Sequence, residues 1–323
     1  MELVSIIVPV YNVAPYLARC VDSLLGQTYP HVEILLAENG SEDGSREIIE
    51  QYVRQDSRVR GLYLETNEGV SAARNRALEA AAGAWICFCD GDDWYRADYL
   101  EKMLACAQAE QADYIVCNYQ IVSDYAAPVV SGSVSGIWTG CDKKQVIACG
   151  PTSSCTHMIR RELYTLSGVQ YPVGVRQYEE LPVVPVLAKY ASAIAVVDLP
   201  LYHYYQRGNG TSASNMAVQS EKNFRIAWQA MRERLGGEYR QEAEFHAIYA
   251  LLYGEILKLC KQKVPAKNIR RKISEFEAEF PAYRANPYLV QMGSAKRVFL
   301  HLVKLRWIAG LRLLAWMHGK IVK

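Results

Sequence analysis

The sequence has no paired cysteine motif and no leader pattern. Its nine cysteines are scattered along the chain, and none falls in a CxxC pair. An odd number of unpaired cysteines is typical of reduced, mostly buried thiols in a cytosolic protein, and it argues against a disulfide framework or a zinc site. The first residues enter an apolar segment with no basic region or cleavage site. We therefore expect no signal peptide and a cytoplasmic location.

The chain also lacks the glycine-rich turn that many nucleotide-binding α/β domains place after their first strand. The apolar segment Leu3–Val10 continues into Tyr11 and Asn12, and a helical pattern over Ala14–Leu25 follows without an intervening glycine. A dinucleotide-binding domain or a sugar-phosphate nucleotidyltransferase needs glycines here, because its backbone must approach phosphates closely. The sequence argues against both classes.

The composition indicates a folded α/β protein. Half of the 323 residues are apolar, 22% are charged, and the net charge of +2 gives no indication of a nucleic-acid partner. Helical patterns separate four expected strands, at Leu3–Val10, Val32–Ala37, Arg60–Glu65 and Trp85–Cys89. Short connections between strands and helices imply right-handed crossovers, and hence a mostly parallel sheet flanked by helices.

Three carboxylates follow the fourth expected strand. Asp90, Asp92 and Asp93 surround Gly91 directly after the apolar run. Carboxylates this close repel one another unless a cation or hydrogen-bond donors lie among them, which favours a divalent metal site. A solvated acidic turn is the alternative, because Asp and Gly are also common turn residues. In a parallel sheet, the cluster would share one edge with the residues that follow the first two strands.

Four segments together resemble the bacterial family 2 glycosyltransferases of the GT-A (Rossmann-like) fold. They match that family's motifs in order and spacing over about the first 120 residues: Ser5–Asn12, Glu38–Ser45, Asn67–Asn75 and Asp90–Asp93. The resemblance implies that the nucleotide of an activated sugar lies across the ends of the first two strands. It also implies that the acidic cluster meets the ribose and a Mg²⁺ or Mn²⁺ ion on the diphosphate.

The resemblance assigns the nucleoside pocket to residues at the first two strand ends. Pro9, Tyr11 and Asn12 would line this pocket. Glu38 and Asn39 stand where the family usually has two aspartates, the second of which reads the uracil imide. The amide of Asn39 can still accept from the imide and donate to a carbonyl, although a different base then also becomes chemically reasonable.

The resemblance places further residues at the diphosphate. Arg74 would face phosphate oxygens, with an ion pair to Glu68 or Glu79 as the alternative. Asp90 would contact the ribose and Asp92 would bind the metal. Asp93 would be a second metal ligand or an orienting neighbour.

A second acidic pair resembles the catalytic block of the same family. Tyr178–Pro185 is similar to its Glu-Asp-Leu-Pro block, in which the second acid is the general base. Glu180 matches that position with one extra methylene, and Glu179 is the reserve candidate. Pro182 is typical of a first helical turn, which would place the Glu180 carboxylate at a helix N-terminus and favour its ionised form. A charged N-cap region without a catalytic role is the alternative.

Two further segments contain candidate donors. Leu201–Ser212 is similar to the family's tyrosine-rich block, whose loop closes over the diphosphate, and Arg207 and His203 would be its donors. A purely structural role is the alternative for His203. For the lone His157 we expect a hydrogen-bonded structural role rather than an acceptor contact.

The C-terminal region has no acidic residue from Phe280 to Lys323, but it contains eight Lys and Arg residues. Charges interrupt its apolar residues too often for a transmembrane span. Acid-free helices with tryptophan and many basic residues are typical of peripheral anchors on anionic lipid, which would place the protein at the inner face of the plasma membrane. A packed helix or a homo-oligomer contact is the alternative.

These patterns predict a metal-dependent, inverting hexosyl- or N-acetylhexosaminyltransferase. The donor would be a nucleotide-diphosphate sugar, with a UDP-sugar expected, and the acceptor a glycan or lipid-linked hydroxyl in cell-surface polysaccharide synthesis. We expect a nucleotide-sugar-binding and catalytic GT-A domain over residues 1–215 and a helical region over 216–323. A non-catalytic nucleotide-sugar-binding or scaffold protein is the competing class, because Glu38, Asn39 and Glu180 depart from the family's usual acids.

Overall fold

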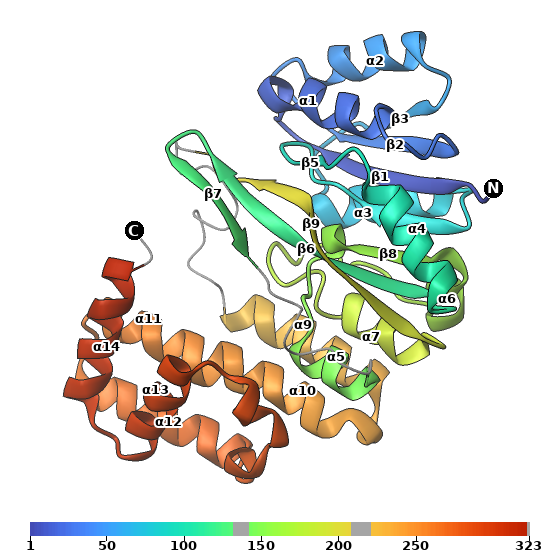
Figure 1. The fold of residues 1–323 in the computed structure, drawn as a ribbon. Coiled ribbons are helices and arrows are strands. Elements are labelled where there is room, and N and C mark those ends of the chain that lie inside the picture. The colour runs from blue at the N-terminus through green and yellow to red at the C-terminus, as the bar shows by residue number, and fades with distance from the viewer. Residues whose placement is uncertain (132–141, 208–220, 322–323) are drawn as a thin grey trace.

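The computed structural model describes residues 1–131, 142–207 and 221–321. A sheet flanked by helices occupies the N-terminal part, and a group of helices occupies the C-terminal part (Figure 1). The sheet has the strand order β3-β2-β1-β4-β8-β6-β9-β5, and β7 pairs with β6. The predicted α/β fold is therefore confirmed.

The first four strands form the parallel half of the sheet. They are β1 (Val4–Val10), β2 (Val32–Asn39), β3 (Val59–Leu64) and β4 (Trp85–Phe88). The helices between them are α1 (Ala14–Leu25), α2 (Ser45–Gln55) and α3 (Val70–Ala80). Every residue of β2 and β4 is buried, as expected for strands that are covered on both faces. The ends of β1, β2 and β4 therefore meet at one edge.

The other half of the sheet is mixed. β8 (His157–Arg160) lies between β4 and β6 (Tyr114–Ser123) and is antiparallel to both. β9 (Ile194–Tyr205) runs parallel to β6 and antiparallel to β5 (Trp94–Tyr95). β7 (Ala126–Ser131) forms an antiparallel hairpin with β6. Further helices here are α4 (Tyr99–Ala109), α5 (Lys143–Cys149), α6 (Arg161–Ser167) and α7 (Val184–Tyr190).

The C-terminal part is helical. It comprises α9 (Glu221–Leu235), α10 (Arg240–Ala247), the π-helix η3 (Ile248–Gly254), α11 (Glu255–Lys261), α12 (Ala266–Glu279), α13 (Ser294–Lys304) and α14 (Ile308–Ile321). The predicted domain boundary between residues 215 and 216 lies outside the described residues. No helix among the described residues is both long and apolar enough to cross a bilayer.

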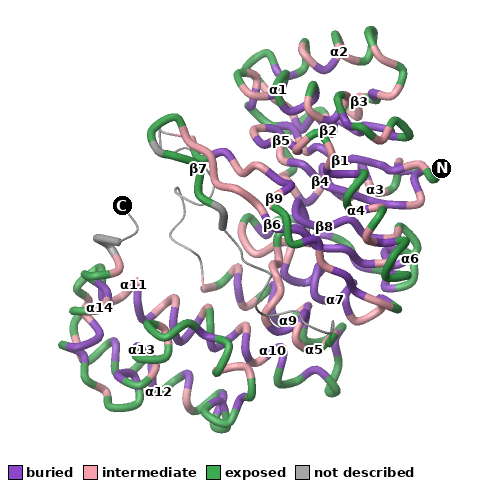
Figure 2. The backbone as a smooth tube through the Cα atoms, in the orientation of Figure 1, coloured by how far each residue is buried: buried purple, intermediate pink, exposed green. Residues whose placement is uncertain are grey.

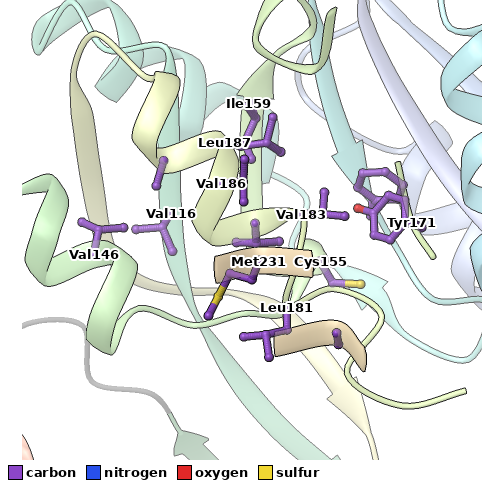
Figure 3. Packing of buried hydrophobic residues seen from close by; sticks show 14 of the residues in the cluster. Val116, Val146, Cys155, Ile159, Tyr171, Leu181, Val183, Val186, Leu187 and Met231 are labelled. Carbon is purple, nitrogen blue, oxygen red and sulfur yellow. The ribbon is translucent and has the colours of Figure 1, made fainter. Parts of the chain in front are cut away.

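One continuous core joins the sheet to the C-terminal helices. Figure 2 shows buried backbone running from the strands through α7 to α9 and α10. In Figure 3, Leu181 and Val183 belong to the same cluster as Met231 of α9. Burying a Leu or Val side chain contributes about 1.5–3 kcal/mol. The turn before α7 is thus anchored at its apolar residues.

Candidate active site

The turns after β1 and β2 are tied together at the sheet edge. The Asp43 carboxylate accepts a hydrogen bond from the Ala14 backbone N–H (2.9 Å), and Asn12 Oδ1 accepts one from the Glu42 N–H (3.0 Å). Asn12 has a φ of +51°, a left-handed conformation that Asn tolerates better than most residues. Next to it, Tyr11 is 43% exposed. The structure therefore leaves the Tyr11 ring accessible beside a fixed pair of turns.

Glu38 and Asn39 end β2 and are buried. Glu38 Oε1 accepts from the Ser41 N–H at 2.5 Å. Asn39 Nδ2 donates to Asn67 Oδ1, and Asn39 Oδ1 accepts from the Glu68 N–H, both at 3.0 Å. An amide has two donors and two acceptor lone pairs, so one of each is used to hold the loop before α3. Base reading by Asn39 stays a prediction.

Asp90 and Asp92 lie at the predicted position beyond β4. The Asp90 side chain is 40% exposed, whereas the Asp92 carboxylate is mostly buried and forms an ion pair with Arg207, whose Nε and Nη2 both lie on Oδ2 at 2.8 and 2.7 Å. Burial, and then the charge of Asp90, raises the pKa of Asp92. Gly91 allows this close packing, because a Cβ there would lie 2.9 Å from a Val13 methyl and 3.5 Å from the Pro9 carbonyl oxygen.

Asp93 has a different environment. It is 1% exposed, and its carboxylate accepts hydrogen bonds from the Tyr205 N–H (2.7 Å) and the Tyr202 hydroxyl. Burial, and then the two neighbouring aspartates, raises its pKa. These contacts tie the acidic loop to β9 and correspond to the orienting alternative for Asp93. Its role as a metal ligand stays untested.

The acidic loop is compatible with a metal held jointly with a diphosphate. Arg207 contacts Oδ2 of Asp92 and Arg74 contacts Oδ1 of Asp90, so each carboxylate presents a second oxygen. Mg²⁺ typically binds proteins through one or two carboxylates together with substrate phosphates. Within the described ranges, no three His, Cys, Asp or Glu side chains could hold an ion without such help.

Arg74 of α3 is the charged centre of the site. Its side chain is 4% exposed and forms ion pairs with three acids: Nη1 lies 3.0 Å from Glu179 Oε1, and Nη2 lies 3.3 Å from Asp90 Oδ1 and 3.5 Å from Glu180 Oε1. Burial opposes the charge, but the three carboxylates raise the pKa of Arg74 well above its usual value. The alternative expected for Arg74 was an ion pair with a glutamate close in sequence. Two of the observed partners, Glu179 and Glu180, instead lie more than 100 residues away in sequence. A diphosphate contact stays a prediction.

Glu180 lies in the turn before α7. Its Oε1 accepts from the Ser154 N–H at 2.7 Å. Burial is the main reason that its pKa rises to about 7, with Arg74 lowering it and the neighbouring acids raising it further. A carboxyl group with a pKa near neutrality is suited to take a proton.

The predicted helix N-terminus at Glu180 is wrong. α7 begins at Val184, and Pro185 rather than Pro182 occupies its first turn. The Glu180 carbonyl oxygen accepts from the N–H groups of Val183 and Val184, both at 3.0 Å, so a separate turn precedes the helix. The Glu180 carboxylate is held by Arg74 and the Ser154 amide instead.

Asn75 is a supporting residue to which the sequence analysis assigned no role. Its Nδ2 donates to the Tyr171 carbonyl, and its Oδ1 accepts from the Tyr171 N–H, both at 2.8 Å. The Tyr171 hydroxyl in turn lies 2.7 Å from Ser154 Oγ. Asn75 therefore holds the segment that leads to Glu180. The sequence could have indicated this role, because Asn75 is the last residue of the Asn67–Asn75 motif and follows Arg74 directly.

In the tyrosine-rich block, Arg207 contacts the acidic loop directly and His203 contacts it indirectly. Arg207 pairs with Asp92, as described, whereas the His203 ring stacks on Trp94 with centroids 5.2 Å apart. Burial lowers the pKa of His203. The Arg19 guanidinium lies 3.9 Å from the Trp94 ring centroid and donates to the Asp92 carbonyl at 2.9 Å. His203 thus reaches the acidic loop through the Trp94 stack, and Arg19 is a contact that the sequence analysis missed.

His157 is structural, as predicted. It is buried, its Nδ1 lies 2.7 Å from the Ser153 carbonyl oxygen, and burial lowers its pKa to about 4. The imidazole is therefore neutral at pH 7 and belongs to the core.

Sequence comparisons place glycosyltransferases among the relatives of this chain. The family model "Glycosyl transferase family 2" matches residues 5–165. The uncharacterized glycosyltransferase EpsJ of Bacillus subtilis (strain 168) is 31% identical over 260 residues, covering 78% of this chain and 72% of EpsJ. The putative teichuronic acid biosynthesis glycosyltransferase TuaG of the same strain is 35% identical over 163 residues, covering 50% of this chain and 63% of TuaG. The match to the putative glycosyltransferase EpsH of the same strain covers 60% of the length of EpsH.

Solved structures share the fold. S. aureus TarS 1–349 in complex with UDP-GlcNAc superposes with a TM-score of 0.73 at 20% identity, covering 98% of this chain and 92% of TarS 1–349. The mannosyltransferase PcManGT of Pyrobaculum calidifontis, in complex with GDP-Man and Mn²⁺, gives a TM-score of 0.54 at 14% identity, covering 98% and 86%. The EpsJ match and the family model show that this chain belongs to glycosyl transferase family 2.

Proposed function

We propose that this chain transfers a hexosyl or N-acetylhexosaminyl group from a UDP-sugar to a hydroxyl of a glycan or lipid-linked acceptor, with inversion. The observation that carries the proposal is the Arg74 ion-pair cluster, which joins Asp90 at the donor edge to Glu180, a carboxyl group with a pKa of about 7. The UDP-GlcNAc complex of TarS supports a UDP-sugar donor. The name of TuaG supports an acceptor in cell-surface polysaccharide synthesis.

Glu180 is the proposed general base. The Ser154 amide and Arg74 fix its Oε1, which leaves Oε2 to take the proton of an acceptor hydroxyl. The acceptor oxygen then attacks the anomeric carbon from the face opposite the diphosphate. The new carbon–oxygen bond forms as the bond to UDP breaks, so an α-linked donor gives a β-linked product.

The acidic loop and Arg207 are the proposed leaving-group site. Asp92, with Asp90 or Asp93, would hold a Mg²⁺ or Mn²⁺ ion, which supplies positive charge to the diphosphate when it is bound. Arg207 lies on Asp92 and can donate its remaining N–H groups to phosphate oxygens. Pro9, Tyr11, Asn12, Glu38 and Asn39 would form the nucleoside pocket, and His203 would act only through the Trp94 stack.

The non-catalytic alternative has less support. A pure binding protein has no need for a partly buried carboxyl group whose pKa is raised to about 7, because its ionisation costs stability. We also propose residues 1–215 as the catalytic unit and 216–323 as a region for peripheral association with the inner face of the plasma membrane.

Two measurements test the proposal. A thermal-shift panel of UDP, GDP, CMP and dTDP, with and without Mn²⁺, should show a metal-dependent stabilisation by UDP that Asp92→Asn loses. UDP release from UDP-GlcNAc should disappear in Glu180→Gln while UDP still binds. UDP release that is unchanged in Glu180→Gln would remove the assigned base. If no nucleotide stabilises the protein, the donor site is wrong.

A further inference from the structure

The last two helices display an unusual concentration of exposed apolar side chains. Seven of the eighteen exposed large hydrophobic residues on the described surface come from the 28 residues between 290 and 317. Single exposed apolar residues are normal, whereas a concentration of them is typical of an interaction site. We name the six members on α13, on α14 and at the corner between them the C-terminal apolar surface: Val298, Leu305, Trp307, Leu313, Trp316 and Met317.

The helix pair has two apolar faces. On α14, Leu313, Trp316 and Met317 follow a spacing that places them on one side of the helix, and they are 43–58% exposed. The side with Leu311 and Ala315 is buried instead, where α14 packs on α11. The inner face therefore accounts for the packing of α14. The exposed apolar side chains of the outer face do not contribute to this packing and need another explanation. In Figures 1 and 2, α14 lies at the outer border of the helical part, away from the sheet.

The corner between α13 and α14 is built to present its apolar residues outward. Arg306 has a φ of +52°, which is unfavourable for a residue other than glycine. Its guanidinium holds this conformation by binding Glu277 of α12 at 2.5 Å and Ser274 Oγ at 2.9 Å. The residues on either side, Leu305 and Trp307, are 58% and 57% exposed. A fixed corner thus carries two protruding apolar side chains.

Basic residues dominate the charge around this surface. From Phe280 to Lys323 the chain has eight basic and no acidic residues, and Glu277 of α12 pairs with Arg284 and Arg306 at 2.8 and 2.5 Å. Arg297 and Lys304 of α13 are exposed and take part in no salt bridge within the described part of the chain. A second copy packed on the same face would bring these like charges together, which costs free energy.

We propose that the C-terminal apolar surface docks on an anionic lipid bilayer. Trp and Leu side chains enter the interface between headgroups and acyl chains, while Lys and Arg meet anionic headgroups. The surface would hold the protein beside a lipid-linked acceptor, and this last step rests on the proposed function. The docking deepens the membrane association proposed above and is independent of the proposed transfer reaction, because none of the surface residues lies in the candidate active site.

The test is flotation of the full chain with vesicles. One set contains phosphatidylcholine alone, and the other also contains phosphatidylglycerol. Wild type should bind the anionic vesicles at least about tenfold more strongly, and high salt should weaken the binding. The variant Trp307→Ser/Leu313→Ser/Trp316→Ser should lose at least about tenfold of the affinity. Arg297→Gln/Lys304→Gln should lose the preference for anionic lipid.

A matched control removes apolar residues elsewhere. Val53→Ser/Leu166→Ser changes exposed apolar residues on α2 and α6 and should leave vesicle binding unchanged. Thermal unfolding verifies that each variant is folded, and UDP release should be retained by all of them without vesicles. Failure of UDP release in wild type would affect only the proposed function.

Three outcomes would overturn the docking proposal. They are absence of binding to anionic vesicles, equal binding to both vesicle types, and vesicle binding that the triple serine variant retains. Light scattering adds a further check. A wild-type oligomer that the serine variant dissolves, together with no vesicle binding, would assign the surface to a second copy instead.

Discussion

Replacing Arg74 with glutamine should change the pH dependence of the reaction. The guanidinium lies 3.0–3.5 Å from the carboxylates of Glu179, Asp90 and Glu180. It lowers the pKa of Glu180 against the effect of burial. An opposite charge at such distances typically shifts a carboxyl pKa by about 1–3 units. The substitution should therefore raise the pKa of Glu180 from about 7 to about 8–10.

The size of the effect follows from the fraction of ionised base. With a pKa of about 7, roughly three quarters of Glu180 is ionised at pH 7.5, whereas a pKa of about 8.5 leaves less than about a tenth. A general base must be ionised to accept a proton. In Arg74→Gln, kcat/KM should thus fall about eightfold at pH 7.5 and recover above about pH 9.

The assay is UDP release from UDP-GlcNAc, followed from pH 6 to pH 10 in wild type, Arg74→Gln and Arg74→Lys. The lysine variant keeps the positive charge, so its acidic limb should stay close to that of wild type. Thermal unfolding checks that each variant is folded. A loss of activity by the same factor at every pH, with an unmoved acidic limb, would refute the electrostatic role and leave Arg74 with a structural one.

Three further predictions concern stability and positioning. Glu180→Gln should unfold at higher temperature than wild type at pH 8, and the difference should vanish near pH 4. The pKa of Glu180 is raised from 4.5 to about 7 in the folded protein, so ionisation of this group at pH 8 destabilises the wild-type fold, whereas the group is protonated near pH 4. The expected gain is on the order of 2–3 kcal/mol, and a pH-independent difference in Tm would contradict it. Asn75→Ala removes both hydrogen bonds to the Tyr171 backbone and should lower kcat about tenfold while the Kd for UDP stays unchanged; weaker UDP binding would argue against this role. Tyr202→Phe removes a donor to the buried Asp93 carboxylate and should cost about 1–3 kcal/mol in urea unfolding, whereas unchanged unfolding would show that the bond contributes nothing.

The sequence was sufficient for the sheet edge. β1, β2 and β4 are short apolar runs with polar residues directly after them, so both the strands and the shared edge could be predicted from the pattern. Asp90 and Asp92 lie there as expected. The antiparallel β8 could not be predicted, because His157 and Arg160 at its ends leave only two apolar residues between them.

The partners of the site residues were harder to predict. Arg74 pairs with Glu179 across 105 positions of sequence, and no local spacing contains that information. The same limit applies to Asp93 and Tyr205, which are 112 positions apart. Pro182 misled because a proline near an acidic pair fits a helix start, whereas the core packing of Leu181 and Val183 shapes a separate turn there.

The Asp93–Tyr205 hydrogen bond also sets the orientation of Arg207. It fixes the end of β9, and the Gln206 N–H continues the ladder to the Val122 carbonyl, so the chain is still extended as it approaches Arg207. Successive side chains in an extended chain point to opposite sides. The side to which Arg207 points, and hence its contact with Asp92, thus depends on whether an odd or an even number of residues separates it from Tyr205. An insertion of one residue there would turn the guanidinium away, and an insertion of two would restore its side.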